Sequence, residues 1–225
     1  MATPKLPSKS EETRLRILDS ALELFRDKGF DSATMRDIAA KAELATGAAY
    51  YYFPSKDSIV MAFYERAFAQ MQPKLTAVVE EARGFERTLH DLIRVKLDYF
   101  APNRAVFRAL LRNGADRQHP LSPFSQETKA IRDADIDCFR RVVETSNLRI
   151  PRDLAPHVPD TLWLFQMGVI FFWVTDDSPN QARTHRLLEL GTKTVTALLR
   201  FSAVPLTRPL RKVAIELIEL VKGDA

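Results

Sequence analysis

The 225-residue sequence contains only one cysteine, Cys138. A single cysteine excludes an internal disulfide and any metal site built from several cysteines, and it suits a reducing cytoplasm. Cys138 lies on an apolar helical stripe, so we interpret it as a small buried residue and not as a nucleophile. The four histidines have no second histidine or cysteine at the spacing of metal ligands. We therefore predict no metal site.

Glycine is also scarce, and the seven glycines are never closer than 18 positions to one another. This spacing excludes the glycine-rich loops that hold nucleotide phosphates. No nucleophile, general base or carboxylate pair stands out as a catalytic group. We predict that the chain is not an enzyme, has no catalytic residues and needs no cofactor.

Long hydrophobic runs are absent as well. The most apolar stretch, residues 161–174, contains Gln166 and is shorter than the roughly 20 residues that span a membrane. We predict a buried helix there. Residues 1–10 carry two prolines and two lysines but no apolar core, so they resemble a flexible basic arm and not a signal peptide. These features predict a cytoplasmic protein without membrane contact.

Charge of one sign does not dominate either. The formal net charge is +4, and residues 1–56 carry nine Lys or Arg against eight Asp or Glu, with 24 against 21 in the rest of the chain. Net charge alone therefore neither indicates nor excludes a nucleic-acid partner.

Apolar residues recur with the period of an α-helix along almost the whole chain. Residues 11–28 are expected to form a helix capped by Ser10, with an apolar stripe of Leu18, Ala21, Leu22 and Phe25. Similar stripes follow downstream as far as residues 210–221, and prolines separate them. No segment shows the two-residue alternation of a β-sheet. The sequence predicts an all-α protein.

Residues 34–53 predict two short helices joined by a turn. Thr34 and Asp37 form the T-x-x-D pattern of a capping box, so a helix is expected from there to about Ala42. A second helix is expected over 46–52, after a three-residue turn. This arrangement is a helix-turn-helix, the motif that places its second helix in the DNA major groove.

Aromatic residues are concentrated on the second of these helices, in the segment ATGAAYYYFPSK at 45–56. Gly47, Tyr50 and Tyr51 share one helix face, where glycine permits close backbone approach and tyrosine can contact phosphate, sugar or a thymine methyl group. Pro54 ends the helix, and Lys56 is expected to contact phosphate. The alternative is that these aromatic residues only pack in a core.

The stretch TMRDIAAKAELATGAAYYYFPSKDSIV, residues 34–60, closely resembles the DNA-binding signature of the tetracycline-repressor (TetR/AcrR) family of bacterial regulators. The resemblance covers roughly residues 11–65. It implies a three-helix DNA-binding head, a larger variable helical body that binds a ligand, and a homodimer. The expected organisation is a flexible arm at 1–10, a head at 11–56, and a ligand-binding and dimerisation body at 57–225, with a linking helix at 57–72.

The resemblance also implies which residues contact the double-stranded operator: Thr34, Arg36, Thr46, Gly47, Tyr50, Tyr51 and Lys56. Two positions depart from the family pattern. Glu43 stands where glycine is common, so a left-handed backbone there would cost about 1 kcal/mol. Ala45 replaces a frequent capping serine, so Thr46 is expected to cap the recognition helix one residue later.

The body carries many aromatic residues and one amide, Gln166, inside an apolar helix. A buried amide needs a partner, which is either another buried group or a ligand. The ligand alternative predicts a small, largely apolar effector near Phe107, Trp163, Gln166 and Phe171. Segments 160–176 and 179–202 correspond in position to the family's dimer interface, where Gly168 and Gly191 would allow close packing. The alternative is that both glycines serve the core of one chain.

Together these features predict a ligand-responsive, dimeric transcriptional repressor that binds a pseudo-palindromic operator and is released by a small apolar ligand. A helical small-molecule-binding protein or enzyme without a DNA role is the alternative. In that case the tyrosines would serve packing alone.

Overall fold

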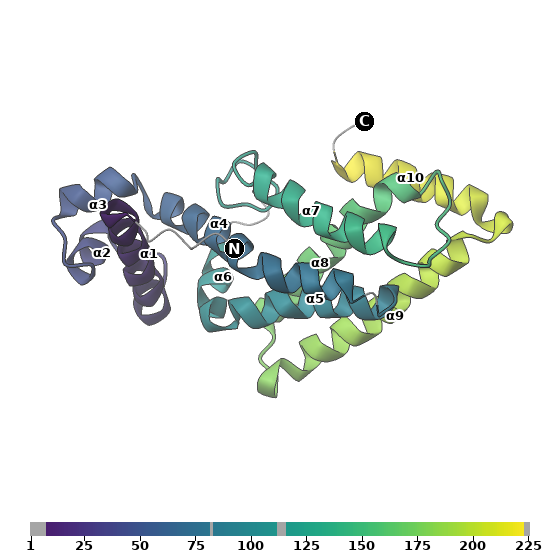
Figure 1. Ribbon diagram of the computed structural model, residues 1–225, viewed down its shortest axis with the longest axis horizontal. Coiled ribbons are helices and arrows are strands. Elements are labelled where there is room, and N and C mark those ends of the chain that lie inside the picture. The colour runs from purple at the N-terminus through teal and green to yellow at the C-terminus, as the bar shows by residue number, and fades with distance from the viewer. Residues whose placement is uncertain (1–7, 82, 112–115, 223–225) are drawn as a thin grey trace, which may run out of the picture. The chain divides into compact units, whose positions relative to one another are not determined.

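A computed structural model describes residues 8–81, 83–111 and 116–222 (Figure 1). Every regular element within these ranges is helical, so the all-α prediction is confirmed. Residues 1–7 of the predicted flexible arm lie outside the described residues. The longer helices are α1 (Lys9–Lys28), α2 (Met35–Lys41), α3 (Thr46–Tyr52), α4 (Lys56–Glu80), α5 (Phe85–Phe100), α6 (Arg104–Leu111), α7 (Lys129–Glu144), α8 (Val158–Thr175), α9 (Ala182–Ser202) and α10 (Arg208–Lys222). Short 3-10 turns η1 to η4 cover Ala101–Asn103, Ala155–His157, Pro179–Gln181 and Pro205–Thr207.

The chain forms two compact units. Unit 1 contains the described residues of 1–69 and 101–131, and unit 2 contains the described residues of 70–100 and 132–225. The predicted boundary after residue 56 differs from this division, because residues 57–69 and the described residues of 101–131 fold with the first three helices. Helix α4 contributes residues to both units.

Unit 1 is built around α1, which packs against α2 and α6. The predicted stripe of α1 is buried, with Leu18, Ala21, Leu22 and Phe25 each at most 4% exposed. Helix α2 in turn packs against α3. The three helices α1 to α3 thus share one apolar core, as a helix-turn-helix requires.

Two predicted helix boundaries were wrong. Helix α1 is capped by Ser8 and not by Ser10: the Ser8 hydroxyl accepts from the Glu11 backbone N–H, and the Glu11 carboxylate accepts from the Ser8 N–H. This S-x-x-E pair satisfies two N–H groups at once, so the helix starts earlier. The linking helix does not stop at residue 72 but runs on to Glu80 with Pro73 inside it.

Unit 2 contains α5, α8 and α9, and α9 packs against the other two. Within the described residues, the segment Ala155–Thr175 is long and apolar enough to cross a membrane by length and composition alone. Eight residues of α8 are nevertheless buried in the protein, including Leu162, Trp163 and Trp173. This burial identifies α8 as a core helix, as its sequence predicted.

The apolar stripe of α10 lies on the surface of unit 2. Leu210, Val213, Leu217 and Leu220 are each at least 60% exposed. Their spacing of three and four residues places them on one helix face. Monomeric soluble proteins rarely expose a contiguous apolar patch of several large side chains.

Candidate DNA-binding surface

The start of α2 is fixed by a complete capping box. The Thr34 hydroxyl accepts from the Asp37 backbone N–H at 3.1 Å, and Oδ2 of Asp37 accepts from the Thr34 N–H at 3.0 Å. The hydrogen bonds from Thr34 lower the pKa of Asp37 below its ordinary value. The predicted cap is therefore confirmed, and it leaves the exposed Arg36 at the second position of the helix.

The turn after α2 is a Schellman motif with glutamate at its left-handed position. Glu43 has φ 56°. The Leu44 N–H donates to the Ala39 carbonyl at 2.9 Å, and the Glu43 N–H donates to the Ala40 carbonyl at 3.1 Å. These two bonds close the helix and direct the chain into α3. The left-handed backbone whose cost was considered for Glu43 is therefore present.

Helix α3 covers Thr46–Tyr52, as predicted, but the expected cap is wrong. The capping position is Ala45, and no side chain caps the helix there. Thr46 is the first helical residue and is half-buried. The N-terminal N–H groups of α3 therefore lack a side-chain partner at the capping position, and such groups attract anions.

The two faces of α3 differ in exposure, as expected. Tyr50 is 50% exposed and Tyr51 is 83% exposed, and a Cβ atom added at Gly47 would have no neighbouring atom within 4 Å. On the opposite side Ala49 and Phe53 are at most 1% exposed. The outer face thus offers two tyrosines and an open glycine to a partner.

Lys56 lies at the start of α4, but its ammonium is bound inside unit 1. Nζ donates to the Phe30 carbonyl at 2.6 Å and to the Asp31 carbonyl at 3.2 Å, and it lies 4.6 Å from the centre of the Phe30 ring. An ammonium group has three N–H donors. Among the residues that the structure describes, the third has no acceptor, so it can serve an external one such as phosphate.

The charges around α2 are mostly paired within unit 1. Lys41 lies 2.9 Å from Glu23, and their hydrogen bond lowers the pKa of Glu23. Lys28 lies 3.4 Å from Asp37. Arg36 differs from these, because it makes no ion pair or side-chain hydrogen bond within the part of the chain that the structure describes. Its guanidinium is available to an outside partner.

The four predicted effector contacts do not belong to one unit. Phe107 is in unit 1, where its ring lies 6.3 Å from that of Phe63 and 5.9 Å from that of Tyr64. Trp163, Gln166 and Phe171 are on α8 of unit 2. Trp163 and Gln166 are buried, and Phe171 is half-buried.

The buried amide of Gln166 has partners inside unit 2. Oε1 of Gln166 accepts from Lys96 Nζ at 2.5 Å, and its Nε2 donates to Oδ2 of Asp135 at 2.7 Å. Lys96 also pairs directly with Asp135 and lies 4.6 Å from the centre of the Phe139 ring. We call Lys96, Asp135 and Gln166 the polar triad. The sequence left two kinds of partner open for Gln166, another buried group or a ligand. The structure supplies buried groups, Lys96 and Asp135.

Sequence reasoning missed Lys96 and Asp135. Lys96 follows Leu89, Leu92 and Ile93 at seven, four and three residues, so its position lies on the apolar face of α5. A charged residue at such a position indicates a buried ion pair. That signal would have identified Lys96, although the identity of its partners, on α7 and α8, depends on tertiary packing.

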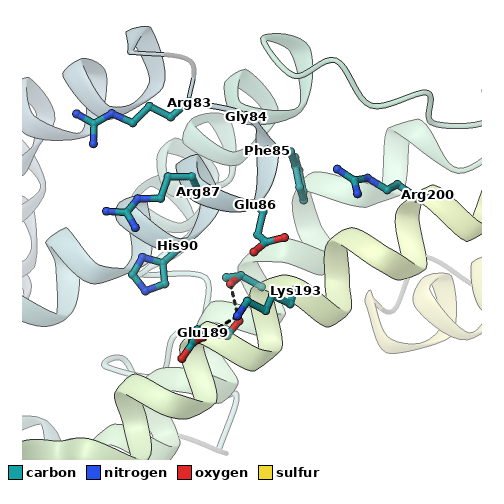
Figure 2. A pocket seen from close by; sticks show the side chains of 10 residues that line it. Arg83, Gly84, Phe85, Glu86, Arg87, His90, Glu189, Lys193 and Arg200 are labelled. Atoms are coloured by element: carbon teal, nitrogen blue, oxygen red, sulfur yellow. Dashed lines mark hydrogen bonds and ion pairs between the residues drawn. The ribbon is translucent and has the colours of Figure 1, made fainter.

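Figure 2 shows a pocket of unit 2 between the start of α5 and α9, with a volume of about 460 Å³. Its cations are largely neutralised by neighbours: Arg87 lies 2.8 Å from Asp91, and Lys193 lies 2.6 Å from Glu189. Glu86 adds a further negative charge to the lining (Figure 2). None of the predicted effector contacts lines this pocket.

Solved structures share the fold of this chain. A TetR transcriptional regulator from Nitrosomonas europaea matches with a TM-score of 0.63 and 23% identity, over 84% of this chain and 99% of the other. FadR from Thermus thermophilus, a TetR-family repressor solved in complex with lauroyl-CoA, matches with a TM-score of 0.59 and 19% identity, over 85% and 95% of the two chains.

Sequence comparisons identify relatives among bacterial regulators. The HTH-type transcriptional regulator SrpR of Pseudomonas putida is 35% identical over 108 residues, which is 48% of this chain and 49% of SrpR. This chain therefore spans about half the length of that relative. The uncharacterised regulator TtgW, also from Pseudomonas putida, is 34% identical over 108 residues, which is 48% of this chain and 78% of TtgW.

Family models match both parts of the chain. Residues 17–63 match the model described as bacterial regulatory proteins, tetR family, and residues 88–215 match the tetracyclin repressor-like C-terminal domain. The second match alone covers more than half of the chain. With a capped helix-turn-helix and an all-helical body in place, the chain belongs to the tetracycline-repressor family of DNA-binding transcriptional regulators.

Proposed function

We propose that this chain is a cytoplasmic, ligand-responsive repressor that binds a pseudo-palindromic operator as a homodimer and is released by a small, largely apolar effector. The observation that carries the proposal is the outer face of α3. Tyr50 and Tyr51 are exposed there beside Gly47, on a helix that the Schellman turn holds against α2. Exposed aromatic residues on a short, firmly packed helix suit contact with a DNA groove.

The proposed DNA contacts divide into two kinds. Arg36, Tyr50 and Tyr51 reach base edges or the groove walls, because they are exposed and Arg36 has no described partner. Thr34, Thr46, Gly47 and Lys56 contact the backbone. Phosphate contacts position the protein, whereas base contacts determine sequence preference.

Dimerisation is supported by the apolar side chains that unit 2 exposes. On α9, Leu198 is 61% exposed and Phe201 is 56% exposed, and the stripe of α10 adds further leucines. Gly168 on α8 has open space around it. Gly191 differs, because a Cβ atom there would lie 2.7 Å from the Phe165 ring of the same chain. We therefore propose α9, α10 and the Gly168 side of α8 as the interface, and we assign Gly191 to packing within one chain.

The effector is proposed to bind the aromatic part of unit 2, with contacts at Trp163 and Phe171 on α8, and Phe107, which belongs to unit 1, is left out of the proposed contacts. Gln166 would take part only if the effector exchanged hydrogen bonds with the polar triad. The related fold of FadR was solved in complex with lauroyl-CoA, which supports a ligand-binding role for a body of this kind.

Release requires that the effector favour a conformation in which the two recognition helices no longer fit successive major grooves, about 34 Å apart. Helix α4 contributes to both units and is the proposed route of this change. A typical coupling free energy of about 1 to 3 kcal/mol would weaken operator binding roughly 5- to 150-fold.

A gel shift with DNA from upstream of the chain's own gene tests the proposal. We expect a discrete shifted band that survives excess nonspecific DNA. Ligands that raise the thermal stability of the protein should then be titrated into the complex. Stabilising ligands that leave operator affinity unchanged would contradict the coupling, and absence of any specific band would favour the alternative without a DNA role.

A further inference from the structure

Two adjoining pockets of unit 2 carry an unmatched positive charge. Both pockets are lined by Arg149 and Ala203, and their volumes are about 430 and 760 Å³. We call their basic residues the arginine groove: Arg149, Arg152, Arg200, Arg208, Arg211 and Lys212.

These residues come from three places in the sequence. Arg149 and Arg152 lie between α7 and α8, Arg200 lies near the end of α9 and is visible in Figure 2, and Arg208 and Lys212 lie in the first turns of α10. These residues therefore lie close together because of the fold and not because they are neighbours in the sequence.

Among the described residues that line the two pockets, Asp153 is the only acidic one, and its carboxylate already pairs with Arg211. Its Oδ2 accepts from Nε of Arg211 at 3.2 Å and from Nη2 at 3.1 Å. Arg211 also donates to the Ser202 carbonyl at 2.8 Å. The five other basic side chains make no hydrogen bond or ion pair with any residue that the structure describes.

This pattern differs from that of the neighbouring pocket in Figure 2, where Arg87 and Lys193 have carboxylate partners. Like charges gathered in a concave surface repel one another and create a positive potential that concentrates anions. Guanidinium groups bind phosphate through paired N–H donors, so several arginines favour a ligand with more than one phosphate.

The size and lining of the pockets indicate a small ligand. Both volumes fall within the range of about 300 to 1,000 Å³ that is usual for small-molecule sites. Leu148, Ile150 and Pro151 are half-buried and contribute apolar lining beside the arginines. We propose that the arginine groove binds a small ligand with several linked phosphate groups, through Arg149, Arg152, Arg200, Arg208 and Lys212.

This inference goes beyond the proposed function, and none of the groove residues is a proposed DNA contact. The groove includes residues of α9 and α10, but the apolar side chains proposed for the dimer interface, such as Leu198, Phe201 and Leu210, do not line it. Isothermal titration calorimetry of the full chain tests the inference, with ATP and inorganic tripolyphosphate as probes at low salt. We expect saturable binding of one ligand per chain. Tighter binding of ATP would identify a nucleotide-type ligand, and equal binding would identify polyphosphate itself; both results support the site.

The test variant is Arg152→Gln with Arg208→Gln, and the matched control is Arg183→Gln with Arg186→Gln, two exposed arginines on α9 outside the groove. The test substitutions should weaken binding of the phosphate probes by about tenfold or more per arginine. The control pair should leave binding within about twofold of the wild type, since distant surface charges are screened. The test variant should melt like the wild type, because neither Arg152 nor Arg208 has a partner to lose among the residues that the structure describes. The control variant loses the exposed ion pairs Arg183–Asp177 and Arg186–Glu189, so its melting temperature is measured beside its affinity.

Two results would overturn the inference. One is the absence of binding of either probe at millimolar concentration and low salt. The other is equal weakening in the test and control variants, which would indicate a general charge effect. Duplex DNA that binds more weakly to the test variant, while neither phosphate probe binds, would assign the groove to nucleic acid and reject a small ligand.

Discussion

Gln166 donates a hydrogen bond from Nε2 to Oδ2 of Asp135 at 2.7 Å, and this bond joins α8 to α7. The same amide accepts from the ammonium of Lys96, which is 3% exposed. The three side chains thus satisfy one another in unit 2. A network of this kind specifies how three helices pack, provided that every member keeps its partners.

The first prediction concerns this polar triad. Lys96→Met removes the countercharge of Asp135 and should lower the free energy of unfolding by about 3 to 5 kcal/mol. The double variant Lys96→Met with Asp135→Leu should be less destabilised than Lys96→Met alone, because it leaves no unpaired charge. Urea denaturation of both proteins measures the difference. If the double variant lost as much free energy of unfolding as Lys96→Met and Asp135→Leu lose together, the two charges would not depend on each other.

A second prediction concerns the left-handed turn of the head. Glu43→Gly should raise the free energy of unfolding of unit 1 by about 1 kcal/mol, because glycine adopts φ 56° without the strain of a Cβ atom. Glu43→Ala is the control, since alanine retains the Cβ atom. Urea denaturation followed by far-ultraviolet circular dichroism measures both. An equal gain from alanine would show that the glutamate side chain, and not the backbone, is the source of the cost.

Lys56 is expected to act in two ways. Lys56→Ala should reduce specific and nonspecific DNA affinity alike and reduce the salt dependence by about one counterion per subunit. It should also destabilise unit 1, because the carbonyls of Phe30 and Asp31 lose their donor. Fluorescence anisotropy over a salt series measures the first effect and thermal melting the second. Lys74→Ala, an exposed lysine on α4, is the control. An unchanged salt slope with lowered stability would assign Lys56 to a structural role alone.

The proposed interface predicts the oligomeric state. Leu198→Glu with Phe201→Glu places two charges on the exposed face of α9 and should convert the dimer to monomer, because burying unpaired carboxylates is strongly unfavourable. Leu15→Glu, on the surface of α1, should leave the dimer intact. Light scattering at micromolar concentration measures both. A wild-type protein that is monomeric under these conditions would contradict the dimeric mechanism as a whole.

The connection between α8 and α9 predicts a pH effect. Burial acts to raise the pKa of Asp176, but hydrogen bonds from Thr184 and Ser178 outweigh it and hold this pKa well below its usual value. A depressed pKa adds stability above the unfolded-state value of about 3.9, and that stability is lost as the pH falls. Asp176→Asn should therefore destabilise the protein at pH 7 and flatten the loss of stability that begins near pH 5 and continues as the pH falls below the unfolded-state pKa. If the free energy of unfolding fell with pH equally in the wild type and in Asp176→Asn, the carboxylate would not have this role.

The head could be predicted closely because its signals are local. Thr34 caps a helix through Asp37, three residues away, and the boundaries of α3 follow from the neighbouring turn and proline. The cap of α1 was missed although it is equally local, since Ser8 and Glu11 form the same pattern as Thr34 and Asp37. The helix-turn-helix itself required no information from outside the segment.

The body could be predicted only as a set of helices. The partners of Gln166 lie 70 and 31 residues away, and periodicity does not indicate which helices meet. The leucines of α10 illustrate the same limit, because a stripe on a sequence does not distinguish burial within one chain from exposure. The arginine groove likewise depends on segments that approach only in the folded body.

The most direct test of the central claim is a DNase I footprint on DNA from upstream of the chain's own gene, combined with the stoichiometry of the complex. We expect protection of two related half-sites about one helical turn apart, with two chains per duplex. Arg36→Ala with Tyr51→Ala should abolish this protection, while Leu15→Glu retains it. Absence of a protected site, or a footprint that the Arg36 and Tyr51 variant retains in full, would contradict operator recognition by α2 and α3.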